Sequence, residues 1–358
     1  SYYLGNGSTN AAYQKLTQTV EEGTVVTFAK VPARTGYVNQ GWSSKKNSEK
    51  ATAKAKCTVN KNITLYAVQK KAVQLTFHRC DGSTWQKTTL AKGSSYSLPG
   101  VRDAEGYTFM GWSTKPMQSV SPQYEAEEKI TVNGNVDLYA VVFNRTTETD
   151  LTEDQLPQVD IYKYKQVIFV GDSRTEFMEN VLTGMGESAT KNVKFVCSAG
   201  KGLDWFTTTG WAQLYSIVQH DSNSILSKKT AVIFNFGVND LSKSADYAEY
   251  YNWIAPQLKS KGCELYFMSV NPVNRLMLPN AGRADRSEAA VRSFNQYMKA
   301  NLSSAYTYID MYSYLKSTGY SFASDHYGTG TVDDGLHYTT RTYKRIFAKC
   351  MDSLRVPA

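Results

Sequence analysis

The chain of 358 residues is too long for one average domain, and its apolar content of 41% is ordinary for globular protein. Its formal net charge is +8, with Lys-rich stretches gathered in the first 145 residues. No run of eighteen apolar residues predicts a transmembrane segment, and no nucleic-acid-reading motif accompanies the basic charge, so neither a membrane span nor a nucleic-acid partner is expected.

The cysteines and the start of the chain place few further limits on the class of protein. The five cysteines are dispersed, without the spacing of a zinc site or of a disulfide framework. The chain opens at Ser1 without a signal peptide, which is consistent with a trimmed or a processed secreted protein. The basic surface has two interpretations: a solubilising face, or a face that meets an anionic glycan or a cell wall.

The first 145 residues repeat themselves with a period of about seventy residues. A Gly-Tyr…Gly-Trp segment at 36–43 returns at 106–113, and a segment ending in Leu-Tyr-Ala-Val at 58–68 returns at 131–141. Glycine permits the backbone turn, and the aromatic residues can close a small core. Leu-Tyr-Ala-Val after an Asn-rich turn predicts a strand.

This pattern resembles the Listeria–Bacteroides repeat, also known from internalin B-repeats. The resemblance implies two β-rich, β-grasp-like modules at 1–72 and 73–145, of the kind that serve bacterial surface proteins as spacers, stalks or adhesive surfaces. No residue in them has the character of a catalytic group. His78 is interpreted as a strand residue rather than a ligand.

The sequence changes character after the repeats. Residues 146–164 are acidic, Thr-rich and polar, which predicts a linker. From 165 to 358, apolar strand runs alternate with segments of helical periodicity. The strand runs are Val167–Val170, Val193–Cys197, Ala231–Phe236, Leu265–Val270 and Tyr306–Ile309, and the helical segments begin near Tyr247, Ser287 and Thr339. Strands apolar on both faces predict a parallel sheet between helices, an α/β/α three-layer sandwich.

Polar blocks stand at the ends of these strands, where parallel sheets hold functional residues. The first strand ends in Gly-Asp-Ser at 171–173, the second in Ser-Ala-Gly-Lys-Gly at 198–202 and the third in Gly-Val-Asn-Asp at 237–240. Asp334 and His337 precede the last helix. Each block alone is compatible with a turn or a cap, but their occurrence together favours a serine hydrolase.

The chemistry of these residues is coherent. Ser173 would be the nucleophile and His337 its base, while Asp334, on the same tight turn as the histidine, would bond the other imidazole nitrogen. An acyl-transfer intermediate needs fixed donors for its oxyanion. The backbone N–H groups of Ser173 and Gly200 and the side-chain amide of Asn239 would supply three.

These four blocks are similar to those of the SGNH hydrolases, also called GDSL esterases, over about 165–355. The resemblance implies a flavodoxin-like three-layer fold and the residue roles just described. Two departures matter. Arg174 follows the serine where the family has Leu, which makes it a candidate for substrate contact, and Gly202 competes with Gly200 as an oxyanion donor.

Other residues near the blocks have competing interpretations. Trp205 and Asn271 are candidates for substrate contact, with core packing and turn formation as their alternatives. His326 is an alternative base without the Asp-x-x-His spacing. Asp172 and Asp240 are interpreted as carboxylates that brace the turns. Without a nucleotide-binding glycine motif or a metal-ligand cluster, no cofactor and no metal are expected.

The sequence therefore predicts a secreted or cell-surface serine esterase of a bacterium, which removes O-acyl groups, most simply acetyl, from a carbohydrate. Its expected partners are an acylated glycan or another small ester as substrate and a cell-wall or surface partner for the repeats. The alternatives are a lipid esterase or thioesterase, an O-acyltransferase on the same fold, and a surface adhesion protein without catalysis.

Overall fold

A computed structural model describes residues 1–160, 163–220, 229–278, 286–324 and 333–354. The chain forms two compact units, and each combines segments from distant parts of the sequence: Ser1–Ser97 with Lys129–Tyr139 in the first, Leu98–Glu128 with Ala140–Ala358 in the second. The second predicted repeat is thus shared between the units. Within the described part of the chain, no helix is long and apolar enough to cross a membrane.

The first unit is built around one long strand, β5 (Leu65–His78). The predicted boundary between the repeats at residue 72 lies inside this strand, so β5 serves both repeats. Its parallel partners are β1 (Tyr2–Tyr3) and the start of β10 (Val136–Asn144), and its antiparallel partners are β3 (Tyr37–Ser43) and β6 (Thr84–Ala91). The unit also holds helix α1 (Ala11–Gln14) and two antiparallel strand pairs: β2 (Thr24–Thr27) with β4 (Lys56–Val59), and β7 (Ser94–Ser97) with β9 (Lys129–Val132).

The repeated Gly-Trp pair has the same structural role in both repeats. In the first, Trp42 packs against Tyr2 with ring centroids 4.8 Å apart and donates its indole N–H to the carbonyl of Ala29, thirteen residues back. In the second, Trp112 donates to the carbonyl of Pro99, also thirteen residues back. These buried tryptophans confirm that the aromatic residues close a small β-rich core.

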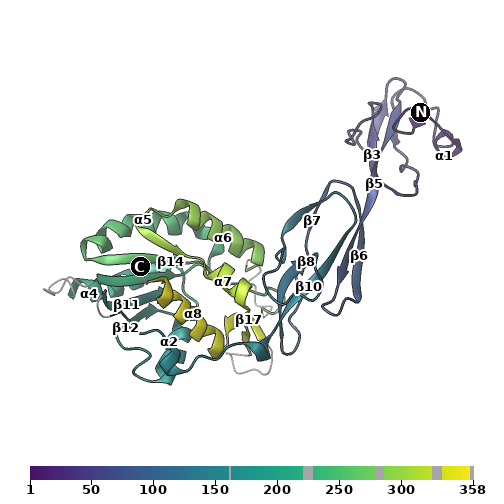
Figure 1. Cartoon of the computed structure of the whole chain (residues 1–358). Helices are drawn as coiled ribbons and strands as arrows, with labels where there is room; N and C mark the ends of the chain where they lie inside the picture. The colour runs from purple at the N-terminus through teal and green to yellow at the C-terminus, as the bar shows by residue number, and fades with distance from the viewer. Residues whose placement is uncertain (161–162, 221–228, 279–285, 325–332, 355–358) are drawn as a thin grey trace. The chain divides into compact units, whose positions relative to one another are not determined.

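The second unit contains a five-stranded parallel sheet (Figure 1) in the order β12-β11-β13-β14-β15. Its strands are β11 (Tyr164–Gly171), β12 (Val193–Cys197), β13 (Lys229–Asn235), β14 (Cys263–Met268) and β15 (Tyr306–Ile309). Successive residues of a strand point to opposite faces. In β11, Ile168 and Val170 enter one hydrophobic core, and Val167 and Phe169 enter another. The sheet therefore lies between two cores, which confirms the three-layer sandwich.

Helices cover both faces of this sheet. On the first core lie α4 (Trp211–His220), α5 (Ser244–Ser260) and α6 (Glu288–Asn301), and on the second lie α2 (Ser173–Met185), α7 (Met311–Thr318) and α8 (Thr340–Ser353). The three helices predicted by periodicity are α5, α6 and α8. The remaining elements are β8 (Tyr107–Ser113), α3 (Leu203–Trp205), β16 (Phe322–Ser324), β17 (Asp333–Tyr338) and the short turns η1 (Arg145–Thr147), η2 (Glu153–Gln155), η3 (Phe206–Gly210) and η5 (Leu241–Lys243).

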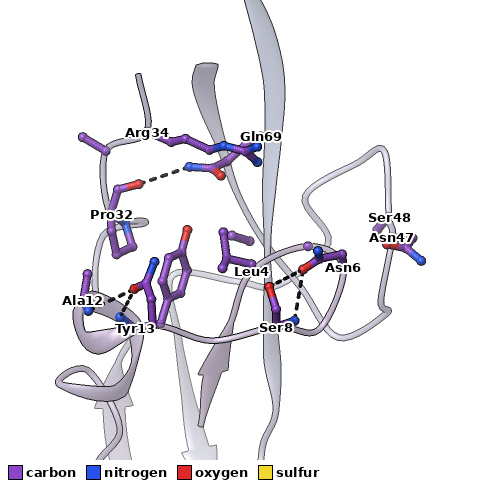
Figure 2. Close-up of a pocket in the computed structure, with 14 residues that line it drawn as sticks. Leu4, Asn6, Ser8, Ala12, Tyr13, Pro32, Arg34, Asn47, Ser48 and Gln69 are labelled. Carbon is purple, nitrogen blue, oxygen red and sulfur yellow. Dashed lines mark hydrogen bonds between the residues drawn. The ribbon is translucent and has the colours of Figure 1, made fainter. Parts of the chain in front are cut away.

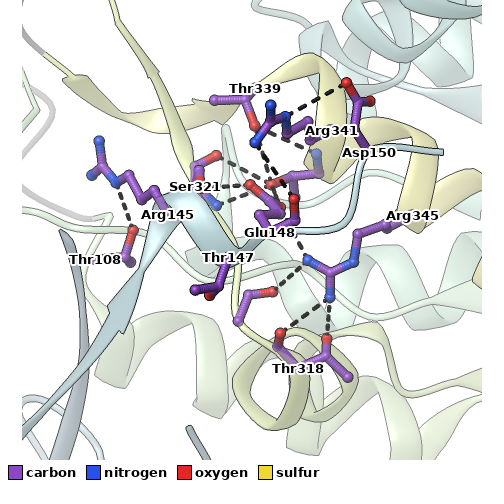
Figure 3. A network of polar contacts seen from close by, with 12 residues as sticks. Thr108, Arg145, Thr147, Glu148, Asp150, Thr318, Ser321, Thr339, Arg341 and Arg345 are labelled. Atoms are coloured by element: carbon purple, nitrogen blue, oxygen red, sulfur yellow. Dashed lines mark hydrogen bonds and ion pairs between the residues drawn. The ribbon is translucent and has the colours of Figure 1, made fainter. Parts of the chain in front are cut away.

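The segment predicted as a linker is packed against the second unit (Figure 3). Glu148 is 5% exposed, and its carboxylate accepts hydrogen bonds from the hydroxyls of Ser321 and Thr342 and from the Arg345 guanidinium at 3.0 Å. Further along the segment, Leu156 and Val159 belong to the second hydrophobic core. A segment held by buried contacts of this kind is part of the folded unit rather than a flexible connection.

Candidate active site

The hydroxyl of Ser173 lies where β11 passes into α2. Ser173 is the first residue of the helix, and Asp172 caps the helix by accepting the N–H of Arg174 at 3.0 Å. Gly171 has no alternative in this turn, since a Cβ there would lie 2.0 Å from the hydroxyl oxygen of Thr175. The Gly-Asp-Ser turn therefore presents the serine at the carboxyl end of the strand.

Ser173, His337 and Asp334 form one hydrogen-bonded chain. The serine Oγ lies 2.9 Å from Nε2 of His337, and Nδ1 of the same ring lies 2.5 Å from Oδ2 of Asp334. All three residues are buried, with the histidine 1% exposed. Because Nδ1–H donates to the carboxylate, Nε2 is the nitrogen that can accept the serine proton.

The carboxylate of Asp334 is held in its charged form. Burial pushes its pKa upward, but the hydrogen bond and charge of His337, with the backbone N–H groups of Leu336 and His337, outweigh burial and hold the pKa below its ordinary value. A charged, fixed carboxylate can orient the imidazole and stabilise it once it is protonated.

Asp334 and His337 were expected on a tight turn, and this expectation is wrong in detail. They lie on strand β17, which pairs antiparallel with β16. The backbone kinks at Gly335, whose φ of +66° favours glycine. A side chain at this position would also collide with the carbonyl oxygen of Asn274, 2.4 Å from a Cβ. The kink explains how two residues of one strand can bond to each other.

The structure gives the two glycines of the second block different roles. Gly200 has a φ of +69°, and a Cβ there would meet no atom within 4 Å, so the space beside it is open. At Gly202, a Cβ would lie 2.4 Å from the carboxylate of Asp240, which accepts the N–H of Leu203. Close packing thus accounts for Gly202, which favours Gly200 as the residue beside a substrate.

The amide of Asn239 is held from both sides. Its Oδ1 accepts a hydrogen bond from Arg286, and one N–H of Nδ2 donates to the carbonyl of Lys201 at 2.7 Å. These two bonds fix the orientation of the amide, and the second N–H of Nδ2 remains as a donor. Sequence reasoning missed Arg286 because only the fold brings it to the third block.

Glu176 is a second residue that sequence reasoning missed. It lies one helical turn after Ser173, and its carboxylate accepts the N–H of Ala199 at 2.6 Å. The strand end that carries Gly200 is thereby tied to the helix that carries the serine. An acidic residue in the first turn of a helix is common for electrostatic reasons, so its presence in the sequence did not single it out.

Arg174, predicted as a candidate for substrate contact, is occupied elsewhere. It is 2% exposed, and its guanidinium donates to the carbonyls of Leu336, Asn271 and Pro272 at 2.9–3.0 Å. The residue therefore joins the helix of Ser173 to the loop after β14 and to β17. Its donors are directed to backbone carbonyls, which corrects the prediction.

The remaining candidates for the site, Trp205, Asn271 and His326, have different outcomes. Trp205 is half-buried and packs against Phe236 with ring centroids 6.1 Å apart, which matches the packing alternative. Asn271 is 1% exposed, and neither polar atom of its side chain has a partner among the described residues, so it stays a candidate for substrate contact. His326 lies outside the described residues. Among the residues that the structure describes, no three His, Cys, Asp or Glu side chains cluster as metal ligands would.

Comparisons with known proteins place the chain among relatives. A family model described as GDSL-like lipase/acylhydrolase matches residues 167–350, and one described as Listeria-Bacteroides repeat domain matches 2–68 and 74–141. No curated protein matches the chain.

Solved structures resemble the chain at low identity. They include an acetyl xylan esterase (10% identity, TM-score 0.36, covering 53% of this chain and 100% of that one) and a putative SGNH hydrolase from Slackia heliotrinireducens (13%, 0.37, 54% and 100%). A third is the C-terminal catalytic domain of peptidoglycan O-acetyltransferase A from Streptococcus pneumoniae (17%, 0.32, 53% and 92%).

Proposed function

Because the chain belongs to the GDSL-like lipase/acylhydrolase family and is a serine ester hydrolase, we propose that it removes O-acyl groups from a carbohydrate through Ser173, His337 and Asp334. The hydrogen-bonded chain of these three residues is the observation that carries the proposal. Acetyl is the simplest acyl group, and the location proposed is the bacterial cell surface or the extracellular space.

Acylation begins at Ser173. His337 Nε2, 2.9 Å away, takes the hydroxyl proton as Oγ bonds to the ester carbonyl carbon. The tetrahedral intermediate collapses by breaking the bond to the sugar oxygen, which receives the proton from His337. Asp334 stabilises the imidazolium that exists between these two transfers.

The intermediate carries a negative oxygen that three donors would stabilise. The N–H of Ser173 is the first of its helix and has no intrahelical acceptor. The N–H of Gly200 borders open space, and the free N–H of Asn239 is aligned by its two other bonds. Donors fixed before the reaction need no reorganisation when the charge develops.

In deacylation, water is the nucleophile and Ser173 is the leaving group. Water donates a proton to His337 Nε2 as its oxygen bonds to the acyl carbon, and the collapse of the second intermediate returns the proton to Ser173. The products are the carboxylic acid and the free enzyme.

The carbohydrate and the location rest on the repeats. Listeria–Bacteroides repeats are typical of surface proteins, and two of them accompany this hydrolase. Surface glycans are the acylated molecules that such an enzyme meets. The hydrolase part of the sequence has no long apolar loop segments to line a groove for a fatty acyl chain, which favours a short acyl group.

A series of p-nitrophenyl esters from acetate to decanoate tests the proposal. We expect acetate to be the best substrate and the Ser173→Ala variant to lose several orders of magnitude in kcat/KM. Ser260→Ala, at an exposed helix end of the same unit, should keep full activity. Release of acetate from an O-acetylated polysaccharide then tests the carbohydrate. Preference for decanoate, or equal activity of the Ser173 variant, would contradict the substrate or the mechanism respectively.

A further inference from the structure

The basic charge of the chain is confined to its first 97 residues. They contain 14 Lys and Arg against 4 Asp and Glu, a net charge of +10, whereas the other 261 residues contain 26 against 28, a net charge of −2. Lys70 is half-buried, and the other thirteen cationic residues of the segment are exposed. The basic surface is therefore a property of the repeats.

Few anionic side chains accompany these cations. Over residues 1–97, all of which the structure describes, no Lys or Arg forms an ion pair, and the ion pair of the unit joins His78 to Asp137. A face that serves solubility alone usually mixes both signs. Unpaired cations repel one another, and an external polyanion that binds them removes this repulsion.

A polar pocket lies in the same unit (Figure 2). Its volume is about 590 Å³, within the range of ligand sites. The turn after β1, the start of α1 and two loops near Pro32 and Asn47 form its walls, together with Gln69 of β5. Most of its polar lining consists of amide and hydroxyl side chains, which suit the hydroxyl groups of a sugar.

Tyr13 supplies a buried hydroxyl without a partner in this pocket. The residue is 2% exposed, its ring packs edge-on against Trp42, and its hydroxyl oxygen has no hydrogen bond within the unit. Figure 2 shows the hydroxyl directed toward the space below Gln69 and Pro32. A buried hydroxyl without a partner is costly, and a ligand or a water can satisfy it.

Arg34 lines the pocket, and Lys46 precedes the lining residue Asn47 in the chain. Arg34 is exposed, with its guanidinium 3.8 Å from the ring centroid of Tyr37, and this guanidinium makes no hydrogen bond to the described residues. Lys46 reaches over the turn at Gly7, where a Cβ would lie 3.1 Å from its ammonium nitrogen. A planar guanidinium is suited to bind a carboxylate through two parallel hydrogen bonds.

We propose that residues 1–97 bind an acidic glycan, with a sugar carboxylate at Arg34, sugar hydroxyls at the polar side chains of the pocket, and other exposed lysines of the segment along the polymer. A nucleic acid fits less well, because Tyr13 is the one aromatic residue of the lining and its ring is buried against Trp42. Bases bind on exposed aromatic rings. The proposal is independent of the esterase reaction.

Binding of the full chain to polygalacturonate tests it, with uncharged dextran and single-stranded DNA as comparison ligands. We expect binding to polygalacturonate that weakens as NaCl rises from 0.05 to 0.5 M, and no binding to dextran. Replacing Arg34 and Lys46 together by Gln should lower the affinity more than tenfold. The matched pair Lys87→Gln and Lys92→Gln removes the same charge from β6 and its turn and should lower it less than threefold.

Three outcomes would overturn the proposal. Equal losses of affinity in the two double variants would exclude the pocket as the binding site. Tighter binding of DNA than of polygalacturonate would indicate a nucleic-acid ligand. Equal binding of dextran and polygalacturonate would exclude a role of charge in binding. Hydrolysis of p-nitrophenyl acetate, measured on the same samples, should be unchanged in both double variants. Loss of binding and loss of the esterase reaction are therefore scored separately.

Discussion

Glu176 is a single residue that connects the helix of the proposed nucleophile, Ser173, to the strand end that carries the proposed oxyanion donor Gly200. It lies in the helix of Ser173 and holds the backbone of Ala199, next to Gly200. Removing the carboxylate should let the second block move away from the serine, without removing any group that touches the substrate. The residue is thus a positioning residue for the proposed oxyanion donors.

Glu176→Ala should lower kcat for p-nitrophenyl acetate by about tenfold, less than the loss of a direct oxyanion donor, with a smaller change in KM. Glu176→Gln keeps an oxygen acceptor for the Ala199 N–H and should recover most of the activity. Steady-state kinetics of both variants test this positioning role. An equal loss of kcat in Glu176→Gln and Glu176→Ala would instead indicate that the charge of Glu176 is required.

Asp172 gives a pH-dependent prediction. Burial raises the pKa of this carboxyl from 3.8 to about 6, although Arg174 and Arg286 oppose the shift. The folded state therefore favours the protonated form, and this stability is present below pH 4 and lost as the pH rises through 6. The cost of the charged form at pH 7 is about 3 kcal/mol.

Asp172→Asn removes this titration and keeps an oxygen that can cap the helix. Urea unfolding from pH 4 to pH 8 should show the variant similar to the wild type at pH 4 and more stable by up to about 3 kcal/mol at pH 7. A difference between the two proteins that is the same at every pH would show that Asp172 does not titrate in this range.

The elements of the second unit differ in how well the sequence predicts them. The central strands β11, β13 and β14 could be predicted because they are almost wholly buried and mostly apolar, whereas the edge strands β12 and β15 are partly exposed and gave a weaker apolar signal. Helices α6 and α8 could be predicted from their periodicity, and Ser287 and Thr339 cap them. Periodicity did not outline helix α2, because its buried first turn consists of the polar residues Ser173, Arg174 and Thr175.

The contacts around the site could be predicted only in part. The sequence singled out Ser173, Asp334 and His337, the proposed nucleophile, acid and base, because their residue types and spacing are distinctive, and the structure brings them together. The residues that hold the second and third blocks were not found, since Glu176 and Arg286 bond to backbone that is distant in sequence. Arg174 was misplaced because its position beside Ser173 in the sequence does not reveal that the side chain points into the protein.

A buried ion network joins three elements of the second unit. Lys316 of α7 is 5% exposed and lies 2.9 Å from Glu125 and 3.3 Å from Glu288 of α6, and it also donates to the carbonyl of Met110. Burial lowers the pKa of Lys316, but the two carboxylates outweigh burial and raise it above its ordinary value. The network helps to explain why Leu98–Glu128 belongs to this unit.

Lys316→Met should lower the free energy of unfolding by about 3–5 kcal/mol, because it leaves the buried carboxylate of Glu288 and the half-buried carboxylate of Glu125 without the Lys316 ammonium. Adding Glu125→Gln and Glu288→Gln should restore much of the loss. Lys243→Met is the matched control, since it breaks an ion pair with the exposed Asp204 and should change stability little. Urea unfolding of the variants at pH 7 measures all three, and a small effect of Lys316→Met would exclude a structural role for the network.

At the scale of the whole molecule, changes of composition and boundaries of compact units do not coincide. The sequence changes character near residue 146, yet the second unit takes in Leu98–Glu128 and the segment from Ala140 onward. A composition shift reports where one kind of residue pattern ends. It does not show which side chains, such as Glu148, contact a helix that is distant in sequence. Residues 146–164 were therefore predicted as a flexible linker.

Two fragments of the chain test this conclusion. A fragment of residues 140–358 keeps Glu148, Leu156 and Val159, whereas a fragment of residues 165–358 loses them and leaves Arg345 buried without its carboxylate. Both lack the partners of Lys316 on Leu98–Glu128, so the comparison isolates the segment 140–164. We expect the shorter fragment to be less stable by more than about 3 kcal/mol in urea unfolding.

The reason for this expectation is that the segment supplies charge and apolar area together. Glu148 neutralises Arg345 in a site where both side chains are at most 8% exposed, and Leu156 and Val159 cover the second core beside α8. Glu148→Gln in the longer fragment separates the two effects, since it removes the charge and keeps the apolar cover. Equal unfolding midpoints of the two fragments would mean that 140–164 is a linker after all, and the hydrolase would then begin at β11.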